Sequence, residues 1–342
     1  MEKEIELNVT NLKSYFSTYT PDLGHLLSLE KFSTGQSNPT YKASFESGQY
    51  VLRSKPPGTL LKSAHQIERE FRVMKALKHS EVPVPTMVHL AQDDDSPIGR
   101  AFFLMEFSQG RIFWDPAVPE CSLEERKIIY KQMAKVLGCL HNINPTTIGL
   151  ESFGRPGNYF YRQTSRWYEQ YKQSALKVNK DMVYLADWLL GNMPEDDGQV
   201  SLVHGDYRLD NMIFKPTSSE VLALLDWELA TLGHPFADLA YQCMQWRLPH
   251  NSSMRGLGGL DREDLGIPNE ETYVSIYCEH RGQQFPENWK FCLLFSYFRL
   301  AAILEGVVRR SIEGNGSNPE IAKTYATAIP LLVEQAKSLL NK

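Results

Sequence analysis

Two short segments carry most of the side chains that could do chemistry. The first reads HGDYRLDN over residues 204–211, and the second reads DWE from Asp226, fifteen residues after Asn211. Phosphoryl transfer from ATP needs a carboxylate near the acceptor hydroxyl and oxygen ligands that hold Mg²⁺ against the phosphates. Asp206 is the candidate for the carboxylate, and Asn211 and Asp226 are the candidate metal ligands.

The spacing inside the first segment strengthens this interpretation. The catalytic loop of protein kinases places its base Asp five positions before its metal-binding Asn, and Asp206 and Asn211 keep that interval. Arg208, two positions past the candidate base, is placed to neutralise the transferring phosphoryl group. A single loop Asp is more often a turn or cap residue, and Asp210 is expected to bond the loop backbone. The joint pattern favours a site.

The elements that position these segments follow from the apolar spacing. The first third alternates as strands do, with one stretch at helical spacing over 67–77. The strands are expected at 28–32, 40–45, 49–55, 86–91 and 101–107. The first three resemble an antiparallel meander.

From Ser122 the pattern becomes mostly helical. Ser122 and Glu125 form a capping-box signature, and apolar residues repeat at helical spacing after it. Further helices are expected near 160–175, 181–192, 236–247, 269–281, 288–313 and 319–340. Between 201 and 232, two short apolar runs predict β-hairpins that carry the candidate site inside a helical region.

Composition bounds the class of protein. The 342 residues, 42% hydrophobic and 23% charged, exclude disorder, collagen and coiled coil and favour two lobes. A net charge of -5 gives the whole molecule no attraction for nucleic acid.

Five scattered cysteines without CxxC spacing indicate reduced thiols, and the acidic start, MEKEIELNVT, is unlike a signal peptide. With no apolar run expected to reach the roughly 18 residues of a membrane span, we expect a cytoplasmic protein without a membrane partner.

The motifs HGDYRLDN and LLDWE resemble those of the aminoglycoside phosphotransferase and choline-kinase-like small-molecule kinases, which are relatives of protein kinases. More closely, GQSNPTY, YVLRSKPPG, HQIEREF, HGDYRLDN and DWELATLGHPFADLA resemble the kinase-like domain fused to acyl-CoA dehydrogenases in some animal proteins. The resemblance runs from about Phe32 to Trp246.

The resemblance implies an α+β, bilobal protein-kinase-like fold. An N-terminal nucleotide-binding lobe over 1–107 would hold a five-stranded antiparallel sheet with one helix. A mainly helical C-terminal lobe over 108–342 would hold the catalytic loop and the substrate site.

The nucleotide contacts that the resemblance implies lie in the first lobe. Glu70 sits on the apolar side of helix 67–77, so its carboxylate should point toward the sheet and pair with a strand cation. The family's Lys is replaced by Arg53, with Lys55 on the same face of the strand, and Arg53 is preferred. In the first hairpin turn, which is not a GxGxxG, Ser37 is the candidate phosphate contact.

The resemblance implies roles for two further regions. Glu106, Phe107 and Ser108 are expected to form the hinge, where backbone groups would bind adenine. Asp238 is expected to bond back to the backbone of His204 and Gly205.

The implied function is phosphorylation of a small-molecule hydroxyl with ATP and Mg²⁺, the acceptor being a hydroxyacyl-CoA. The implied acceptor site lies near 155–195, where Tyr159, Tyr161, Arg166, Trp167 and Tyr168 suit a planar or apolar portion, although the same aromatics would also serve helix packing. The alternatives are a silent pseudokinase that binds nucleotide or a protein, and an aminoglycoside kinase. A protein acceptor is disfavoured, because Asp226 to Asp238 leaves little chain for an activation segment.

Overall fold

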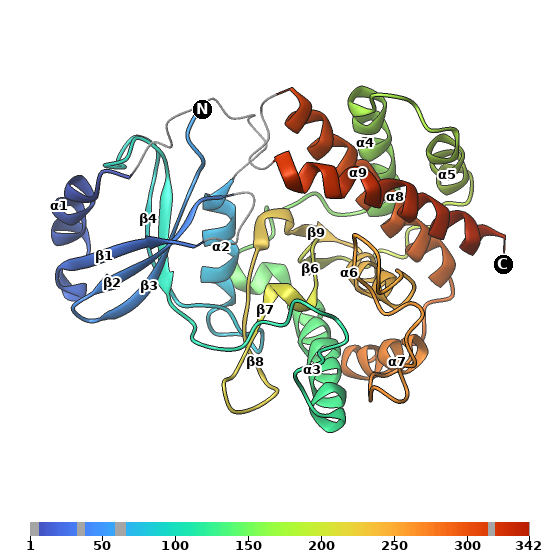
Figure 1. Ribbon diagram of the computed structural model, residues 1–342, viewed down its shortest axis with the longest axis horizontal. Coiled ribbons are helices and arrows are strands. Elements are labelled where there is room, and N and C mark those ends of the chain that lie inside the picture. Colours follow the sequence, from blue (N-terminus) through green and yellow to red (C-terminus); the bar gives the residue numbers. More distant parts are fainter. Residues whose placement is uncertain (1–6, 33–37, 59–65, 314–318, 342) are drawn as a thin grey trace. The chain divides into compact units, whose positions relative to one another are not determined.

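The computed structural model describes residues 7–32, 38–58, 66–313 and 319–341. The chain divides into two compact units (Figure 1). The smaller unit comprises Met1–Gly110 with Leu222–Glu228, and the larger comprises Arg111–Val221 with Leu229–Lys342. The first part of the smaller unit therefore ends three residues beyond the expected lobe boundary at 107, and the segment that contains Asp226 groups with it.

The smaller unit is built on the expected five-stranded antiparallel sheet, whose strand order is β1-β2-β3-β5-β4. Its strands are β1 (Leu26–Lys31), β2 (Thr40–Phe45), β3 (Gly48–Ser54), β4 (Met87–Ala91) and β5 (Phe102–Glu106). They lie within a few residues of the predicted ranges. The first three form the predicted meander.

Two helices cover the sheet of the smaller unit, α1 (Val9–Tyr19) and α2 (Ile67–Leu77). The α1 helix was not predicted, although Leu12, Tyr15 and Phe16 have helical spacing and are buried. They pack in one core with Leu52 and Leu104. Because neighbouring strand residues face opposite sides, Arg53 lies on the other side of the sheet from Leu52.

The α2 helix packs on that other side. Phe71 of α2 contacts Phe103 of β5, with 6.3 Å between the ring centroids. Phe103 pairs in register with Arg53. The packing therefore turns the Glu70 side of α2 toward the strand that carries Arg53.

The larger unit is mainly helical, as predicted. Its long helices are α3 (Leu123–Asn142), α4 (Tyr159–Ser174), α5 (Lys180–Gly191), α6 (Phe236–Cys243), α7 (Glu270–Arg281), α8 (Trp289–Ile312) and α9 (Pro319–Leu340). The predicted capping box of Ser122 and Glu125 begins α3. The helix expected at 236–247 instead ends as α6 at Cys243 and continues as a 3₁₀ turn over Met244–Trp246.

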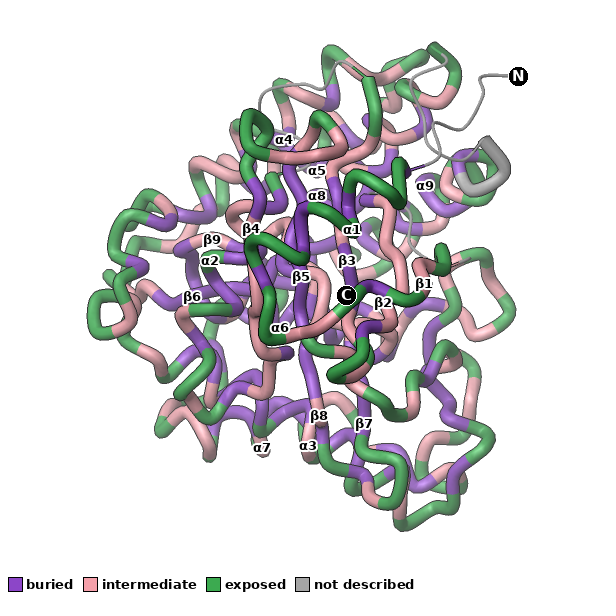
Figure 2. Tube along the Cα trace, turned by 90° about the vertical axis from the view of Figure 1, so that its left-hand side faces the viewer, coloured by how far each residue is buried: buried purple, intermediate pink, exposed green. Residues whose placement is uncertain are grey.

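The α8 helix is the core helix of the larger unit and packs against α4, α5, α6 and α9. It is also long and apolar enough to cross a membrane by length and composition, so the expectation that no apolar stretch reaches that length is wrong. In its most apolar window, 83% of the residues are buried inside the protein, as Figure 2 shows for much of this helix. Its apolar character is thus accounted for by the core.

Short strands carry the candidate catalytic segments. They are β6 (Ser201–Val203), β7 (Met212–Phe214), β8 (Val221–Leu224) and β9 (Thr231–Gly233). The β6 strand pairs antiparallel with β9, and Ser201 lies opposite Gly233. The β6 strand leads directly into the HGDYRLDN segment.

Candidate active site

A buried carboxylate holds the start of the HGDYRLDN loop in the larger unit. The side chain of Asp238, on α6, accepts hydrogen bonds from the backbone amides of His204 at 2.6 Å and Gly205 at 2.9 Å. The expected contact is therefore present. Burial alone would raise the pKa of Asp238, but His141 at 3.4 Å, His204 and the backbone donors lower it below its usual value. Asp238 is thus an ionised anchor for the loop.

Gly205 is required by this loop for two reasons. Its φ of +85° lies in the region that favours glycine, and a Cβ there would stand 2.6 Å from the carbonyl oxygen of Leu229. Its own carbonyl oxygen accepts a hydrogen bond from Arg299 of α8 at 3.0 Å. The backbone is therefore held from both α6 and α8 immediately before Asp206.

Both carboxylate oxygens of Asp206 accept hydrogen bonds within the larger unit. The hydroxyl of Tyr241, on α6, donates to Oδ1 at 2.6 Å, and the amide of Asn211 donates to Oδ2 at 3.1 Å. Arg208 Nε lies 3.6 Å from Oδ1. Burial alone would raise the pKa of Asp206, but Arg208, Tyr241 and Asn211 lower it. Asp206 is therefore an oriented, ionised carboxylate at neutral pH, as a hydrogen-bond acceptor for a hydroxyl must be.

Arg208 is shared between two carboxylates. Its terminal nitrogen donates to Asp210 at 2.5 Å, in addition to the ion pair with Asp206. Asp210 was expected to serve the loop backbone, and its contact with Arg208 is an addition to that interpretation. Asp206 and Asp210 already balance part of the charge of Arg208. Its role in neutralising a phosphoryl group stays a prediction.

The chemistry of the predicted metal ligands fits Mg²⁺. The amide nitrogen of Asn211 donates to the backbone oxygen and the carboxylate of Asp206, which leaves its Oδ1 as the atom that can ligate a cation. Asp226 offers a carboxylate that is about one-third exposed. Carboxylate and amide oxygens are the ligands that Mg²⁺ prefers. Asn211 belongs to the larger unit and Asp226 to the smaller one.

A buried ion-pair network occupies the predicted phosphate-contact region of the smaller unit. Arg53 Nε lies 3.2 Å from Glu70, and its terminal nitrogen lies 2.8 Å from Asp226. Glu70 is only 1% exposed and accepts a further hydrogen bond from Asn38 at 3.1 Å. Burial alone would lower the pKa of Arg53, but Glu70 and Asp226 raise it well above its usual range. Arg53 therefore keeps its charge.

The two candidate strand cations have different partners. Lys55 pairs with Glu68 at 2.5 Å and with Asp93 at 2.8 Å, so Arg53 is the cation that pairs with Glu70. Its role toward nucleotide stays a prediction. Sequence reasoning missed the contact of Asn38 with Glu70, although Asn38 belongs to the GQSN turn. Ser37 lies outside the described residues.

The backbone at Asp226 is unusual. Its φ is +65°, a region that non-glycine residues rarely adopt and that Asp and Asn tolerate best. Such conformations cost about 1–3 kcal/mol and concentrate at functional sites. The strand cation Arg53 holds the carboxylate in this geometry.

The expected hinge residues differ in whether their backbone amides already donate to another backbone group. The amides of Glu106 and Phe107 donate to Thr86 at 2.9 Å and Gln49 at 3.2 Å. Among the described residues, the amide of Ser108 has no such backbone acceptor. Only Ser108 of the three thus presents an amide donor.

The ring of Phe107 lies nearly parallel to that of Phe32, with 6.5 Å between centroids and 10° between planes.

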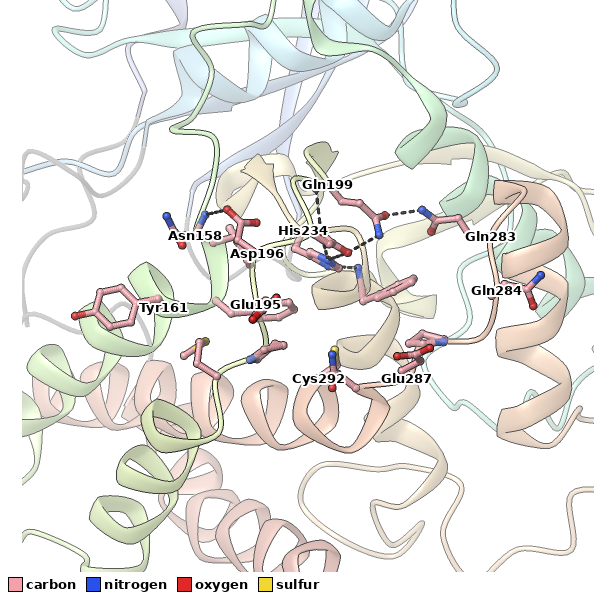
Figure 3. A pocket seen from close by; sticks show the side chains of 18 of the residues that line it. Asn158, Tyr161, Glu195, Asp196, Gln199, His234, Gln283, Gln284, Glu287 and Cys292 are labelled. Carbon is pink, nitrogen blue, oxygen red and sulfur yellow. Dashed lines mark hydrogen bonds and ion pairs between the residues drawn. The ribbon is translucent and has the colours of Figure 1, made fainter.

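The aromatic side chains predicted near the acceptor divide into two groups. Tyr159 and Trp167 are buried, and Tyr159 packs against Phe295 of α8, so these two serve helix packing. Tyr161 is exposed, and Tyr159 and Tyr161 both line a cavity of the larger unit (Figure 3). The side chain of Arg166 lies over the Trp167 ring.

Residues 28–272 match the phosphotransferase enzyme family, and the chain belongs to that family. A solved structure from Ralstonia eutropha, named as a candidate aminoglycoside phosphotransferase, is 42% identical with a TM-score of 0.85, covering 97% of this chain and 99% of its own. Aminoglycoside phosphotransferase APH(2'')-Ib, solved with ADP, shares the fold at 15% identity with a TM-score of 0.60, covering 96% of this chain and 99% of its own. The predicted kinase-like fold is confirmed, and the family to which the chain belongs is one of phosphotransferase enzymes.

The chain is also similar to proteins named for another activity. It is 46% identical over 308 residues to acyl-CoA dehydrogenase family member 10 of Mus musculus, which covers 90% of this chain and 28% of that protein. Family member 11 of Rattus norvegicus is 40% identical over 332 residues, covering 95% of this chain and 42% of that protein. The chain thus spans less than half the length of these relatives, and the predicted resemblance is confirmed.

Proposed function

We propose that the protein transfers the γ-phosphoryl group of Mg²⁺-ATP to a hydroxyl group on the acyl chain of a hydroxyacyl-CoA. The observation that carries the transfer step is the carboxylate of Asp206, which Tyr241 and Asn211 orient from its two sides. A carboxylate held in this way accepts a hydrogen bond from the acceptor hydroxyl and keeps its oxygen aimed at the phosphorus.

In the proposed reaction, the acceptor oxygen forms a bond to the γ-phosphorus while the bond from that phosphorus to the bridging oxygen of ADP breaks. The hydroxyl proton passes to Asp206. Asn211 and Asp226 are the proposed ligands of Mg²⁺, which supplies neutralisation of phosphate charge when it is bound. Arg53, held by Glu70, is proposed to bind the phosphates, because its guanidinium keeps its charge.

The nucleotide is proposed to be an adenine nucleotide bound at the hinge. The amide of Ser108 is a donor for a base edge, and the nearly parallel rings of Phe32 and Phe107 suit a flat ligand. The ADP-bound relative that shares this fold supports the same proposal.

The CoA-linked acceptor is supported by the relatives rather than by a site. The chain is 40% to 46% identical to part of proteins named acyl-CoA dehydrogenase family members. When a kinase and an acyl-CoA dehydrogenase are joined in one chain, their active sites are held near each other, which favours a shared class of substrate. The phosphates of CoA need cations, for which Arg155 and Lys62 are the proposed candidates, because Arg53 is proposed for the phosphates of ATP and Lys55 is paired with Glu68 and Asp93. Lys62 lies outside the described residues. We also propose that the reaction takes place in the cytoplasm.

The test is Mg²⁺-ATP-dependent phosphate gain, measured by mass spectrometry on hydroxyacyl-CoAs of several chain lengths. The matching free hydroxy acids control for CoA recognition, aminoglycosides test the other acceptor class, and Asp206→Ala controls for the enzyme. A product formed only from the CoA esters and lost in Asp206→Ala supports the proposal. Phosphorylation of aminoglycosides alone would replace the acceptor, and nucleotide binding without transfer to any compound would favour a pseudokinase.

A further inference from the structure

Arg299 is a buried cation in the middle of α8. It is only 5% exposed, and among the residues that the structure describes, no Asp or Glu forms an ion pair with its guanidinium. Taking a charge out of water is unfavourable unless an opposite charge or several hydrogen bonds compensate for it. The burial of this cation therefore needs an explanation other than an ion pair.

The hydrogen bonds of Arg299 differ from those of another buried arginine in the larger unit. Its terminal nitrogen Nη1 donates to the carbonyl oxygen of Gly205 at 3.0 Å, while its Nε is enclosed without an acceptor in the described part of the chain. Arg126 of α3 instead donates to three backbone carbonyl oxygens of two loops. Arg126 thus joins loops as a structural arginine does, whereas Arg299 directs its donor at the residue before Asp206.

The peptide group between Gly205 and Asp206 is held at both ends. Its carbonyl oxygen accepts from Arg299, and its amide donates to Nδ1 of His204 at 3.2 Å. Because glycine has no Cβ and adopts many backbone conformations, the peptide group that follows it can rotate at little cost. Such a rotation would change the direction in which the side chain of Asp206 leaves the backbone. Arg299 therefore opposes a movement that would misdirect this carboxylate.

Arg299 also faces the side chain that orients the carboxylate of Asp206. Its guanidinium carbon lies 5.9 Å from the centre of the Tyr241 ring, within the range of a cation–π contact. Burial raises the pKa of Tyr241 well above its usual value, and the charge of Arg299 opposes that shift. A positive charge near a phenol makes its hydroxyl a stronger hydrogen-bond donor. Arg299 thus supports the hydrogen bond from Tyr241 to Asp206.

We propose that Arg299 is a positioning residue for phosphoryl transfer, which fixes the peptide group before Asp206 and polarises the hydroxyl of Tyr241. Its buried charge serves the catalytic carboxylate rather than the packing of α8. It acts through these groups and not on the reacting atoms, and all of them belong to the larger unit. This inference rests on the proposed function, because it concerns the reaction of Asp206.

The test compares Arg299→Met and Arg299→Lys, with Arg126→Met as the matched control. Methionine removes the charge and the donors, whereas lysine keeps the charge and a donor. With the hydroxyacyl-CoA that the unmodified protein phosphorylates best, kcat should fall about tenfold in Arg299→Met, and the KM for Mg²⁺-ATP should stay within about twofold. In Arg299→Lys, kcat should lie between these two values. Arg126→Met should unfold at a lower urea concentration but keep the kcat of the folded protein.

A second measurement needs neither acceptor nor nucleotide. In protein labelled with ¹⁵N-aspartate, the amide signal of Asp206, identified with Asp206→Asn, should be sharp in the unmodified protein and in Arg126→Met. In Arg299→Met it should broaden, because the peptide group exchanges between two orientations on the microsecond to millisecond timescale. If Arg299→Met does not fold, Arg299→Lys decides, and it should broaden the same signal to a smaller extent.

The outcomes separate this inference from the proposed function. A normal kcat in Arg299→Met, or a sharp Asp206 signal in that variant, would overturn the inference while phosphoryl transfer by the unmodified protein stands. Equal losses of kcat in Arg299→Met and Arg126→Met would also overturn it, because Arg299 would then act only through folding. If the unmodified protein phosphorylates no compound, the proposed function fails, and the Asp206 signal still decides whether Arg299 fixes the loop.

Discussion

The hydroxyl of Tyr241 donates a 2.6 Å hydrogen bond to Oδ1 of Asp206, from a helix that begins thirty residues after Asp206. The same helix supplies Asp238, which binds the backbone of His204 and Gly205. One helix therefore sets both the path of the loop and the direction of its carboxylate. Tyr241 is a positioning residue, because it acts on Asp206 and not on the reacting atoms.

The change Tyr241→Phe removes the donor to Oδ1. Because this hydrogen bond helps to lower the pKa of Asp206, its loss should raise that pKa and move the acid limb of the kcat/KM profile to higher pH. The turnover number should fall by roughly tenfold at neutral pH, with little change in KM for ATP. The measurement is a pH–rate profile for both proteins. A uniform loss at every pH, with no displacement of the acid limb, would argue against this role.

The change Asp206→Asn keeps the shape of the side chain and an oxygen for Tyr241 but removes the charge. Turnover should fall by about a hundredfold or more, since a general base typically contributes that much. Nucleotide affinity, measured by titration with ADP and Mg²⁺, should stay within about threefold, because Asp206 is proposed to face the acceptor. Retention of normal turnover would remove Asp206 from the mechanism.

The change Arg53→Met should destabilise the protein by about 3 kcal/mol, because it leaves the buried Glu70 without its cation. Glu70→Gln in the same background should restore part of that loss. The control is Lys55→Met, whose partners Glu68 and Asp93 are more exposed than Glu70, and which should cost about 1 kcal/mol or less. The measurement is the free energy of unfolding in denaturant. Equal losses in the free energy of unfolding for Arg53→Met and Lys55→Met would contradict the assignment of Arg53 as the cation of the buried Glu70.

The change Asp238→Asn tests the anchor of the catalytic loop through pH. The pKa of Asp238 is lowered on folding, so its ionised form stabilises the protein above the ordinary carboxyl value of 3.8. That contribution is lost as pH falls through the lower pKa of the folded state. The unmodified protein should therefore lose its stability advantage over Asp238→Asn as the pH is lowered from 5 to 3, measured by denaturant titration. An advantage that does not change with pH would show that the charge is unimportant.

Much of the fold could be predicted because its signals are local. The strands of the sheet, α2 and the capping box of α3 follow from side-chain periodicity over a few residues. The strand order was not predicted, because β5 lies between β3 and β4 and the connection from β3 to β4 contains α2. The α1 helix was not predicted, although its buried residues Leu12, Tyr15 and Phe16 show helical spacing. The bounds of α6 also differed, since its last turn tightens into a 3₁₀ helix.

The sequence by itself determined the family motif, because the interval from Asp206 to Asn211 is a property of six consecutive positions. Only the tertiary structure decided which side chains meet. Arg53 and Asp226 are separated by 173 positions, and Asp206 and Tyr241 by 35, so no local pattern could pair them. Arg53 faces Glu70, while Lys55 faces Glu68 and Asp93, because Glu68 and Glu70 of the first turn of α2 point to different sides of the helix. Burial strengthens the electrostatic interaction within these pairs, because it removes them from water, and burial arises only when the chain folds.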